Sequence, residues 1–272
     1  MQKGVDVEEE RFEMAEIHVN VPYPMLKQRI DFVVENRIHP EIYFGGKDLD
    51  SVEEEDVKKL GEVLQRHGLE VTLHGPFMDL SPGGVDPKIK QVTRDRFMQT
   101  IEWAAILKSK SVVFHPGYAN WLFDGNVDLW LQGSLDTWIP LVEKARRADL
   151  VLAIENVYEE GPDSILLLLN RIRSPHFRFC FDTGHHHAFS GRKVSLERWI
   201  GTLKDYLWEV HLHDNHSLGD EHLPVGEGDF DFDRFFRFLA ESGLKPIYTI
   251  EPHREEHLWP SLKMARKWIN TP

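Results

Sequence analysis

The chain has little of what builds a secreted or membrane-spanning protein. Its one cysteine, Cys180, excludes an intramolecular disulfide framework and fits a reducing cytosol. Its apolar runs fall short of the roughly 20 residues needed to span a bilayer. The acidic residues 1–10 lack the apolar core of a signal peptide. We therefore expect a cytoplasmic protein with no membrane partner.

Positive charge is also in short supply. The chain has 32 Lys and Arg against 45 Asp and Glu, which gives a net charge of −13. A uniformly acidic surface repels phosphate backbones, so generic nucleic-acid binding is disfavoured. Bound divalent ions would reverse the sign inside a pocket, so this argument applies to the surface rather than to an internal site.

No linker or low-complexity tract divides the 272 residues. Short β-type runs alternate with longer helical patterns throughout, which indicates βαβ units and a parallel sheet. We predict an α/β fold, a single (β/α)8 TIM barrel spanning residues 1–272, with residues 1–14 as an N-terminal extension. The main rival is an open doubly wound sheet, which more often uses five or six strands.

The predicted elements follow the chain as eight strand and helix pairs. Strands are expected at 16–20, 41–44, 70–74, 111–115, 151–155, 179–182, 208–211 and 248–251. Helices are expected at 24–36, 51–67, 87–108, 128–148, 162–173, 196–206, 231–242 and 255–269. Ser51 and Glu54 form a capping-box pattern at the start of the second helix, and Gly68 marks its end.

Residues that can bind a divalent metal end or closely follow six of these apolar runs. They are His74, His115, Glu155, Asp182, His211 and Glu251. A parallel barrel brings the carboxyl ends of its strands together, and active sites of that fold lie there. The sequence therefore predicts that these side chains converge on one site.

Each residue alone also has a structural explanation. A single His74 or His115 is more often a hydrogen-bonded core histidine than a ligand. Glu155 and Glu251 are harder to explain in this way, because an ionised carboxylate near a core is costly unless it is paired or metal-bound.

Further candidates lie beside the strand ends. Asp182 and His185 are three residues apart in a tight turn, and alternation places His211 and His213 on one strand face. Asp220 and His222 can share an ion, with Gly226 and Gly228 allowing a tight loop. We expect His186 and His187 to be solvated loop residues.

The remaining polar and aromatic candidates have two explanations each. Cys180 is expected to be a small buried hydrophobe. Phe77 and Trp121 could line a substrate wall by stacking, or simply cover the barrel top. Arg254 could hold a substrate phosphate, or be an ordinary surface residue. Glu227, Asp229 and Asp231 are expected to be solvated loop and helix-capping residues.

Imidazoles combined with carboxylates suit zinc, manganese, iron or cobalt rather than magnesium or calcium. We expect one to three divalent ions per chain, with zinc or manganese favoured.

In the order and spacing of its strand-end motifs, from about Leu73 to His253, the chain resembles the xylose isomerase-like TIM-barrel superfamily. The matching stretches are Leu73-His74-Gly75-Pro76, Phe114-His115-Pro116-Gly117, Ile154-Glu155-Asn156, Asp182-Thr183-Gly184-His185, His211-Leu212-His213-Asp214-Asn215, the segment 220–228 and Ile250-Glu251-Pro252. The superfamily includes sugar-phosphate isomerases and epimerases, inosose dehydratases and the endonuclease IV family. Together these motifs are specific for the superfamily but not for one reaction.

Resemblance to the isomerase and epimerase branch implies one divalent ion held by Glu155, Asp182, His211 and Glu251. The ion would hold two neighbouring oxygens of a sugar or sugar phosphate. Glu155 and Glu251 would then act as catalytic bases on opposite faces of an enediolate. His213, Trp121, Phe77 and Arg254 are the substrate-binding candidates.

Resemblance to the endonuclease IV branch implies three zinc ions and a phosphodiester substrate such as abasic DNA. The nine ligands would be His74, His115, Glu155, Asp182, His185, His211, Asp220, His222 and Glu251. The chain departs from this branch at Glu221, where a basic residue is usual, and at Gly184, where a cysteine is usual.

Those departures, and the acidic net charge, favour a small-molecule enzyme over a nuclease. A carbohydrate- or metal-binding barrel without turnover is a third, less favoured hypothesis. The sequence does not predict the oligomeric state.

Overall fold

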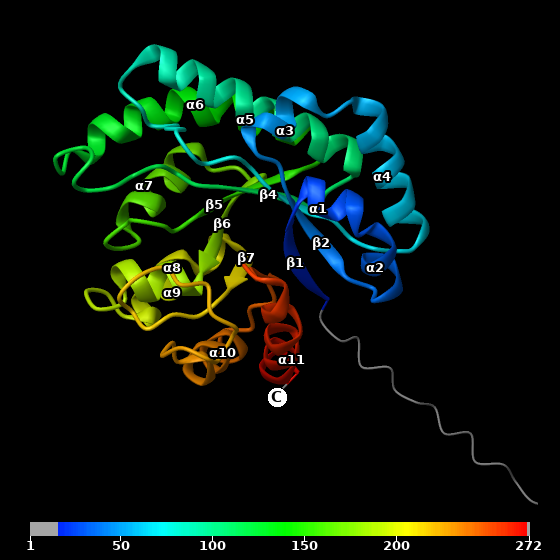
Figure 1. Ribbon diagram of the computed structural model, residues 1–272. Coiled ribbons are helices and arrows are strands. Elements are labelled where there is room, and N and C mark those ends of the chain that lie inside the picture. Colours follow the sequence, from blue (N-terminus) through cyan, green and yellow to red (C-terminus); the bar gives the residue numbers. More distant parts are fainter. Residues whose placement is uncertain (1–15, 271–272) are drawn as a thin grey trace, which may run out of the picture.

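The computed structural model describes residues 16–270, and the expected extension at 1–14 lies outside them. Eight parallel strands close into one barrel in the order β1 to β8. Helices surround the barrel, as Figure 1 shows. The prediction of a single (β/α)8 TIM barrel is thereby confirmed for the fold. No helix within 16–270 is long and apolar enough to cross a membrane.

The strands are short, as is usual for this fold. They are β1 (Ile17–Pro22), β2 (His39–Tyr43), β3 (Thr72–His74), β4 (Ser111–Phe114), β5 (Val151–Glu155), β6 (Phe177–Asp182), β7 (Leu207–Leu212) and β8 (Ile247–Ile250). The main helices between them are α1 (Tyr23–Gln28), α2 (Ile30–Glu35), α3 (Gly46–Ser51), α4 (Glu54–Arg66), α5 (Pro87–Leu107), α6 (Val127–Arg147), α7 (Asp163–Ile172), α9 (Leu196–Leu203), α10 (Phe232–Glu241) and α11 (Leu258–Ile269). A short turn, α8 (Thr183–His185), directly follows β6.

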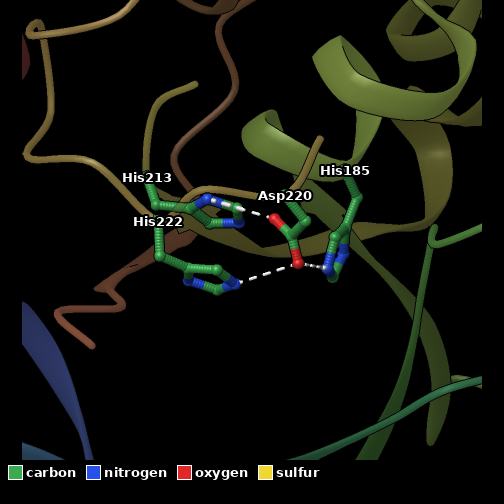
Figure 2. A group of neighbouring side chains, drawn as sticks. All are labelled: His185, His213, Asp220 and His222. Atoms are coloured by element: carbon green, nitrogen blue, oxygen red, sulfur yellow. Dashed lines mark hydrogen bonds and ion pairs between the residues drawn. The ribbon is translucent and has the colours of Figure 1, made fainter. Parts of the chain in front are cut away.

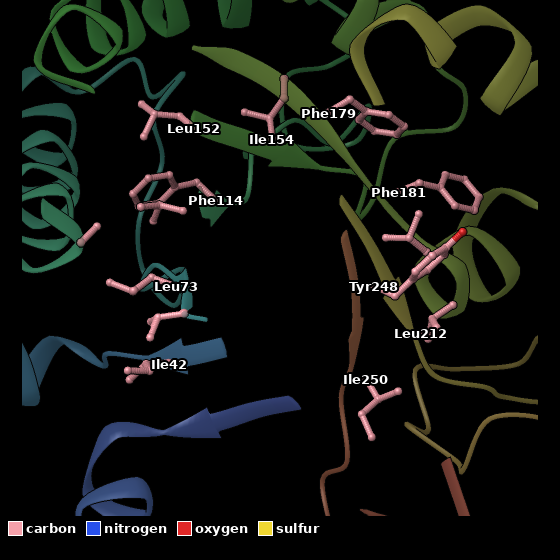
Figure 3. Packing of buried hydrophobic residues seen from close by; sticks show 14 of the residues in the cluster. Ile42, Leu73, Phe114, Leu152, Ile154, Phe179, Phe181, Leu212, Tyr248 and Ile250 are labelled. Carbon is pink, nitrogen blue, oxygen red and sulfur yellow. The ribbon is translucent and has the colours of Figure 1, made fainter. Parts of the chain in front are cut away.

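The core lies between the barrel and its helices. Alternation along each strand sends one set of side chains outward, and Figure 3 shows Phe114, Ile154 and Phe181 among this set. Val210 and Leu212 belong to the same buried cluster, which leaves His211 for the barrel interior. A small separate cluster of Val113, Ala153 and Cys180 is also buried, as expected for Cys180.

Local signals predicted most helix ends but failed at Ser51. Ser51 is the last residue of α3, and its hydroxyl donates to the Lys47 carbonyl, 2.8 Å away, rather than capping the next helix. The N–H of Val52 bonds to the Asp48 carbonyl, and α4 begins only at Glu54 without a side-chain cap. The capping box at Ser51 was therefore wrong. Gly68 does follow the end of α4, with a φ of +66°.

Three other helices differ from the expected ranges. The predicted helix at 24–36 divides at Arg29 into α1 and α2. The helix at 196–206 ends as a 3-10 turn over Lys204–Tyr206, and the last helix is preceded by a 3-10 turn over Glu255–His257.

His186 was expected to be a solvated loop residue, and that expectation was wrong. It lies in a wide helical turn, His186–Ser190, and only 4% of it is exposed. Its ring contacts Phe181, Trp199 and Phe230.

Candidate metal centre

The carboxyl ends of the strands bring all nine predicted ligands into one continuous cluster. Glu155, at the end of β5, lies at its centre and is fully buried. Its Oε2 lies 3.2 Å from Nε2 of His74 and 3.4 Å from Nε2 of His115. Its Oε1 lies 2.9 Å from Nδ1 of His185. One carboxylate thus contacts histidines from three other strand ends.

His211 joins Glu155 to Glu251 on the opposite side of the barrel. Its Nδ1 lies 3.1 Å from Oε1 of Glu251 and 3.6 Å from Oε1 of Glu155. Asp182 is paired with His211 in the β6–β7 register, and its Oδ1 lies 3.5 Å from Nδ1 of His185. These contacts bring together Glu155, Asp182, His211 and Glu251.

Asp220 lies between three histidines, as Figure 2 shows. Its Oδ2 lies 3.1 Å from Nε2 of His222 and 3.4 Å from Nε2 of His185. Its Oδ1 lies 3.7 Å from Nδ1 of His213. The His213 and His222 rings stack with centroids 3.8 Å apart.

A buried aspartate holds the loop that carries Asp220 and His222. Asp214 is fully buried and accepts four backbone N–H bonds of 2.9–3.1 Å. The donors are Asn215, Gly226, Gly228 and Phe230. The two glycines expected to permit a tight loop therefore bond to one carboxylate, and Asp214 shapes the whole segment 215–230.

Three histidines are turned by backbone carbonyl groups. Each places Nδ1 against a carbonyl oxygen and directs Nε2 to the cluster. The pairs are His74 with Gly75 at 2.8 Å, His185 with Asn156 at 3.1 Å, and His222 with Glu251 at 3.4 Å. A carbonyl can only accept, so Nδ1 carries a proton, and Nε2 is the nitrogen that can bind a metal once it is deprotonated.

The charges of the cluster are strongly coupled. Burial lowers the pKa of His74, but the Glu155 carboxylate outweighs it and raises that pKa to about 9. Burial is likewise outweighed by Asp182 at His185 and by neighbouring acidic groups at His211, so both pKa values are raised well above the usual range. Without a metal, protons on histidine balance the carboxylates.

The donor set fits a divalent cation. Glu155 Oε1, His211 Nδ1 and His213 Nδ1 are buried and have no hydrogen-bond partner among the described residues. Yet Glu155 Oε1 lies 2.9 Å from Nδ1 of His185, and His211 Nδ1 lies 3.1 Å from Oε1 of Glu251. These buried polar atoms therefore lie close to partners without making hydrogen bonds to them, which leaves them available to a cation. The mixture of imidazole and carboxylate suits zinc, manganese, iron or cobalt.

Four substrate-binding candidates occupy different places. Phe77 stacks on His115, with centroids 4.5 Å apart, and His213 is buried with Nε2 3.0 Å from Asp182. Trp121 is 77% exposed, and the Arg254 side chain is 70% exposed, 3.9 Å from Glu256. The first two lie in the cluster, and the last two lie at the surface.

Gly184 is explained by His213. A Cβ at position 184 would overlap the His213 imidazole, whose Nε2 is tied to Asp182. Any side chain at position 184 therefore needs the space that the ring fills.

Other functional residues were not predicted from the sequence. Asn156 makes two hydrogen bonds to the Asp182 backbone, at 2.9 and 3.0 Å, and so fixes that strand end. His253 stacks on His222 with centroids 3.4 Å apart. Inside the barrel, Oε2 of Glu41 lies 3.2 Å from Nε2 of His211. Glu41 could have been noticed in the sequence, because a carboxylate there begins the apolar run Glu41-Ile42-Tyr43-Phe44.

The fold and the site together define a parallel barrel with a cluster of imidazoles and carboxylates at its strand ends. The chain belongs to the xylose isomerase-like TIM barrel family, whose model matches residues 39–270.

Relatives by sequence carry different activities in their names. An uncharacterized protein of Methanocaldococcus jannaschii, MJ1311, is 30% identical over 202 residues, 72% of this chain and 69% of its own length. A probable endonuclease 4 of Mycoplasma pneumoniae is 21% identical over 76% of this chain and 79% of its own. The L-ribulose-5-phosphate 3-epimerase UlaE of Escherichia coli is 31% identical over 47% of this chain and 46% of its own.

Solved structures share the fold. A D-tagatose 3-epimerase-like protein has a TM-score of 0.78 and 24% identity, covering 93% of this chain and 97% of its own. The TTHB071 protein of Thermus thermophilus, soaked with ZnCl2, has a TM-score of 0.74 and 21% identity over the same shares.

Proposed function

We propose that this protein is a divalent-metal-dependent isomerase or epimerase acting on a sugar or sugar phosphate. The observation that carries the proposal is the placement of two carboxylates, one fully buried and one 10% exposed, around one imidazole nitrogen. Nδ1 of His211 lies 3.1 Å from Glu251 and 3.6 Å from Glu155. A reaction that moves a proton between carbon atoms, or between two faces of one carbon, needs such a pair of bases.

Glu155, Asp182, His211 and Glu251 would hold the ion. When bound, a divalent ion polarises the substrate oxygens and acidifies the neighbouring C–H group. Burial raises the pKa of Glu251, but the His211 charge more than offsets it and lowers the pKa, so the carboxylate is ionised and able to accept a proton. Phe77, stacked on His115, would offer an apolar ring to one face of the sugar.

Proton exchange tests the proposal directly. Incubating a panel of ketoses, aldoses and their phosphates in deuterated water should place deuterium at one carbon of the true substrate. Glu251→Gln should slow this exchange by about 10²–10⁴-fold, because a general base is lost. Glu256→Gln, in the same loop but exposed, is the matched control and should exchange at the wild-type rate.

A second function is favoured by one specific observation. The five residues outside the inner four, namely His74, His115, His185, Asp220 and His222, join the same cluster. A phosphodiesterase with three metals would use all nine ligands. The net charge of −13 disfavours DNA as its substrate.

Metal content separates the two functions. One tightly bound ion per chain supports the isomerase, and three support the phosphodiesterase. Cleavage of an abasic-site duplex, lost in Glu251→Gln, would overturn the sugar proposal. Sugar binding without any exchange would instead indicate a non-catalytic binding barrel.

A further inference from the structure

The barrel interior beneath His211 is polar, where TIM barrels usually place bulky branched residues. Two carboxylates, Glu41 and Glu209, are fully buried there. Side chains of Asn20, Ser111 and Thr249 bond to them. Burying carboxylates is costly, so this layer requires a physical reason.

Glu41 has both of its oxygens engaged. Oε2 lies 3.2 Å from Nε2 of His211, and Oε1 accepts a 2.7 Å hydrogen bond from the Asn20 amide. Asn20 and Glu41 are direct neighbours in the β1–β2 register, so the backbone fixes the amide beside the carboxylate. The carboxylate cannot turn away from His211 without losing the bond to Asn20.

His211 is held differently from three other histidines of the cluster. His74, His185 and His222 each have a backbone carbonyl oxygen beside Nδ1, although Nδ1 of His185 also lies 2.9 Å from Glu155. His211 faces Glu155 and Glu251 with Nδ1, and its Nε2 contacts the side chain of Glu41. Its orientation therefore depends on a group that a point mutation can remove.

Glu209 lies close to the same ring but has other partners. Its oxygens accept hydrogen bonds from Ser111 at 2.7 Å and Thr249 at 2.9 Å, and it lies 4.0 Å from Nε2 of His211. The ligand atoms of Glu41, Glu209 and His211 come within 4.8 Å of one another. Hydrogen bonds from Ser111, Thr249 and Asn20 already engage both oxygens of Glu209 and one oxygen of Glu41.

We propose that Glu41 is a positioning residue, which accepts Nε2–H of His211 and thereby turns the Nδ1 lone pair to the divalent ion between Glu155 and Glu251. The inference rests on the metal site of the proposed function, and it is independent of which substrate is turned over. Carboxylates that orient metal-binding histidines in this way typically change metal affinity by about 10–100-fold.

Two matched variants test it in the full-length protein. Glu41→Gln keeps the size of the side chain, but its amide cannot satisfy both His211 and Asn20. Glu209→Gln makes the same change in the same layer, at a side chain whose oxygens are held by Ser111 and Thr249 rather than by His211. Zinc affinity, measured by competition with a chelating dye, should fall by about 10–100-fold in Glu41→Gln and stay at the wild-type value in Glu209→Gln.

A second measurement needs no variant. Imidazole ¹⁵N spectra of the zinc-loaded wild-type protein should show His211 with its proton on Nε2, whereas His74 and His222 carry theirs on Nδ1. The proposal is overturned if His211 shows the Nδ1–H form, if Glu41→Gln binds zinc as the wild type does, or if Glu209→Gln loses as much affinity. A wild-type protein that binds no zinc, manganese or cobalt also overturns it.

Failure of the sugar chemistry would look different. If zinc binds tightly, and Glu41→Gln weakens it, but no sugar undergoes proton exchange, the positioning role stands and the proposed reaction falls.

Discussion

Histidines at the two ends of the barrel have opposite hydrogen-bond arrangements. At the carboxyl end, His74 donates Nδ1–H to a backbone carbonyl and turns Nε2 to Glu155 in the cluster. At the amino end, His39 lies with His18 and Glu70 in a group whose ligand atoms also come within 4.8 Å of one another. There Nδ1 of His39 accepts the Glu70 N–H at 2.9 Å, so the proton must be on Nε2. This second group therefore lacks the lone pair that an ion needs from His39.

His18 should make the protein sensitive to acid. Burial, with the nearby His39, lowers its pKa from 6.5 to about 4. In the unfolded chain it takes up a proton below about pH 6.5, while in the folded protein it stays neutral to about pH 4. Stability should therefore fall as pH drops from 6.5 towards 4, with a slope of up to about 1.4 kcal/mol per pH unit from this group.

Urea unfolding of the metal-free protein between pH 7 and pH 4.5 measures that slope. His18→Gln keeps a polar partner for Thr72 and should flatten the slope by about one proton. Equal slopes in the wild type and the variant would contradict the assignment, whatever the absolute stability of the variant.

At the scale of elements, the loop after β7 depends on one side chain. Asp214 accepts the four N–H bonds that give the segment 215–230 its shape, and that segment supplies Asp220 and His222. The proposed inner ligands, Glu155, Asp182, His211 and Glu251, lie at the strand ends and do not depend on this loop. The two parts of the site should therefore separate when the loop loosens.

Asp214→Asn should loosen the loop at 215–230 and leave the strand-end residues in place. An amide has one acceptor oxygen in place of two, so at least one buried N–H loses its partner, at a cost of about 1–3 kcal/mol. We expect faster amide hydrogen exchange across residues 215–230, weaker binding of any outer ions, and retention of one ion at the inner ligands. Asp229→Asn, in the same loop, is the control. Unchanged exchange in Asp214→Asn would refute this role.

Sequence patterns predicted the elements where the determining interactions are local. Gly68 ends α4 because its positive φ is a local requirement. The capping-box prediction at Ser51 was wrong because the Ser51 hydroxyl donates to the Lys47 carbonyl in α3. The sequence pattern did not distinguish α3 from α4. The candidate ligands at the strand ends could be selected from the sequence because they end or closely follow apolar runs. The roles of Glu41 and Asp214 depend on contacts between distant segments, such as the 170 residues from Glu41 to His211, which periodicity does not encode.

At the scale of the whole molecule, closure of the barrel creates the site. Glu155, Asp182, His211 and Glu251 come from four successive strands, and an open sheet would hold the first and last of these apart. The same closure concentrates acidic groups, whose repulsion must be balanced by protons or by bound cations. Folding and ion binding should therefore be coupled.

Removal of the ion should lower thermal stability. An ion that binds only the folded state stabilises it by about 4 kcal/mol at a free concentration a thousand times Kd. For a chain of this length that corresponds to a rise in Tm of roughly 10 °C. Scanning calorimetry before and after dialysis against a chelator, then with zinc or manganese restored, measures the change. Glu155→Gln should respond far less, and an unchanged wild-type Tm would contradict the coupling.

A side chain at position 184 and the ring of His213 would occupy the same space. Since any Cβ at position 184 enters the volume of that imidazole, neither position can drift alone. We expect Gly184→Cys to displace the His213 ring from Asp182 and to be accommodated only with a smaller residue at position 213. The double variant of Gly184→Cys with His213→Ala should therefore be more stable than Gly184→Cys alone.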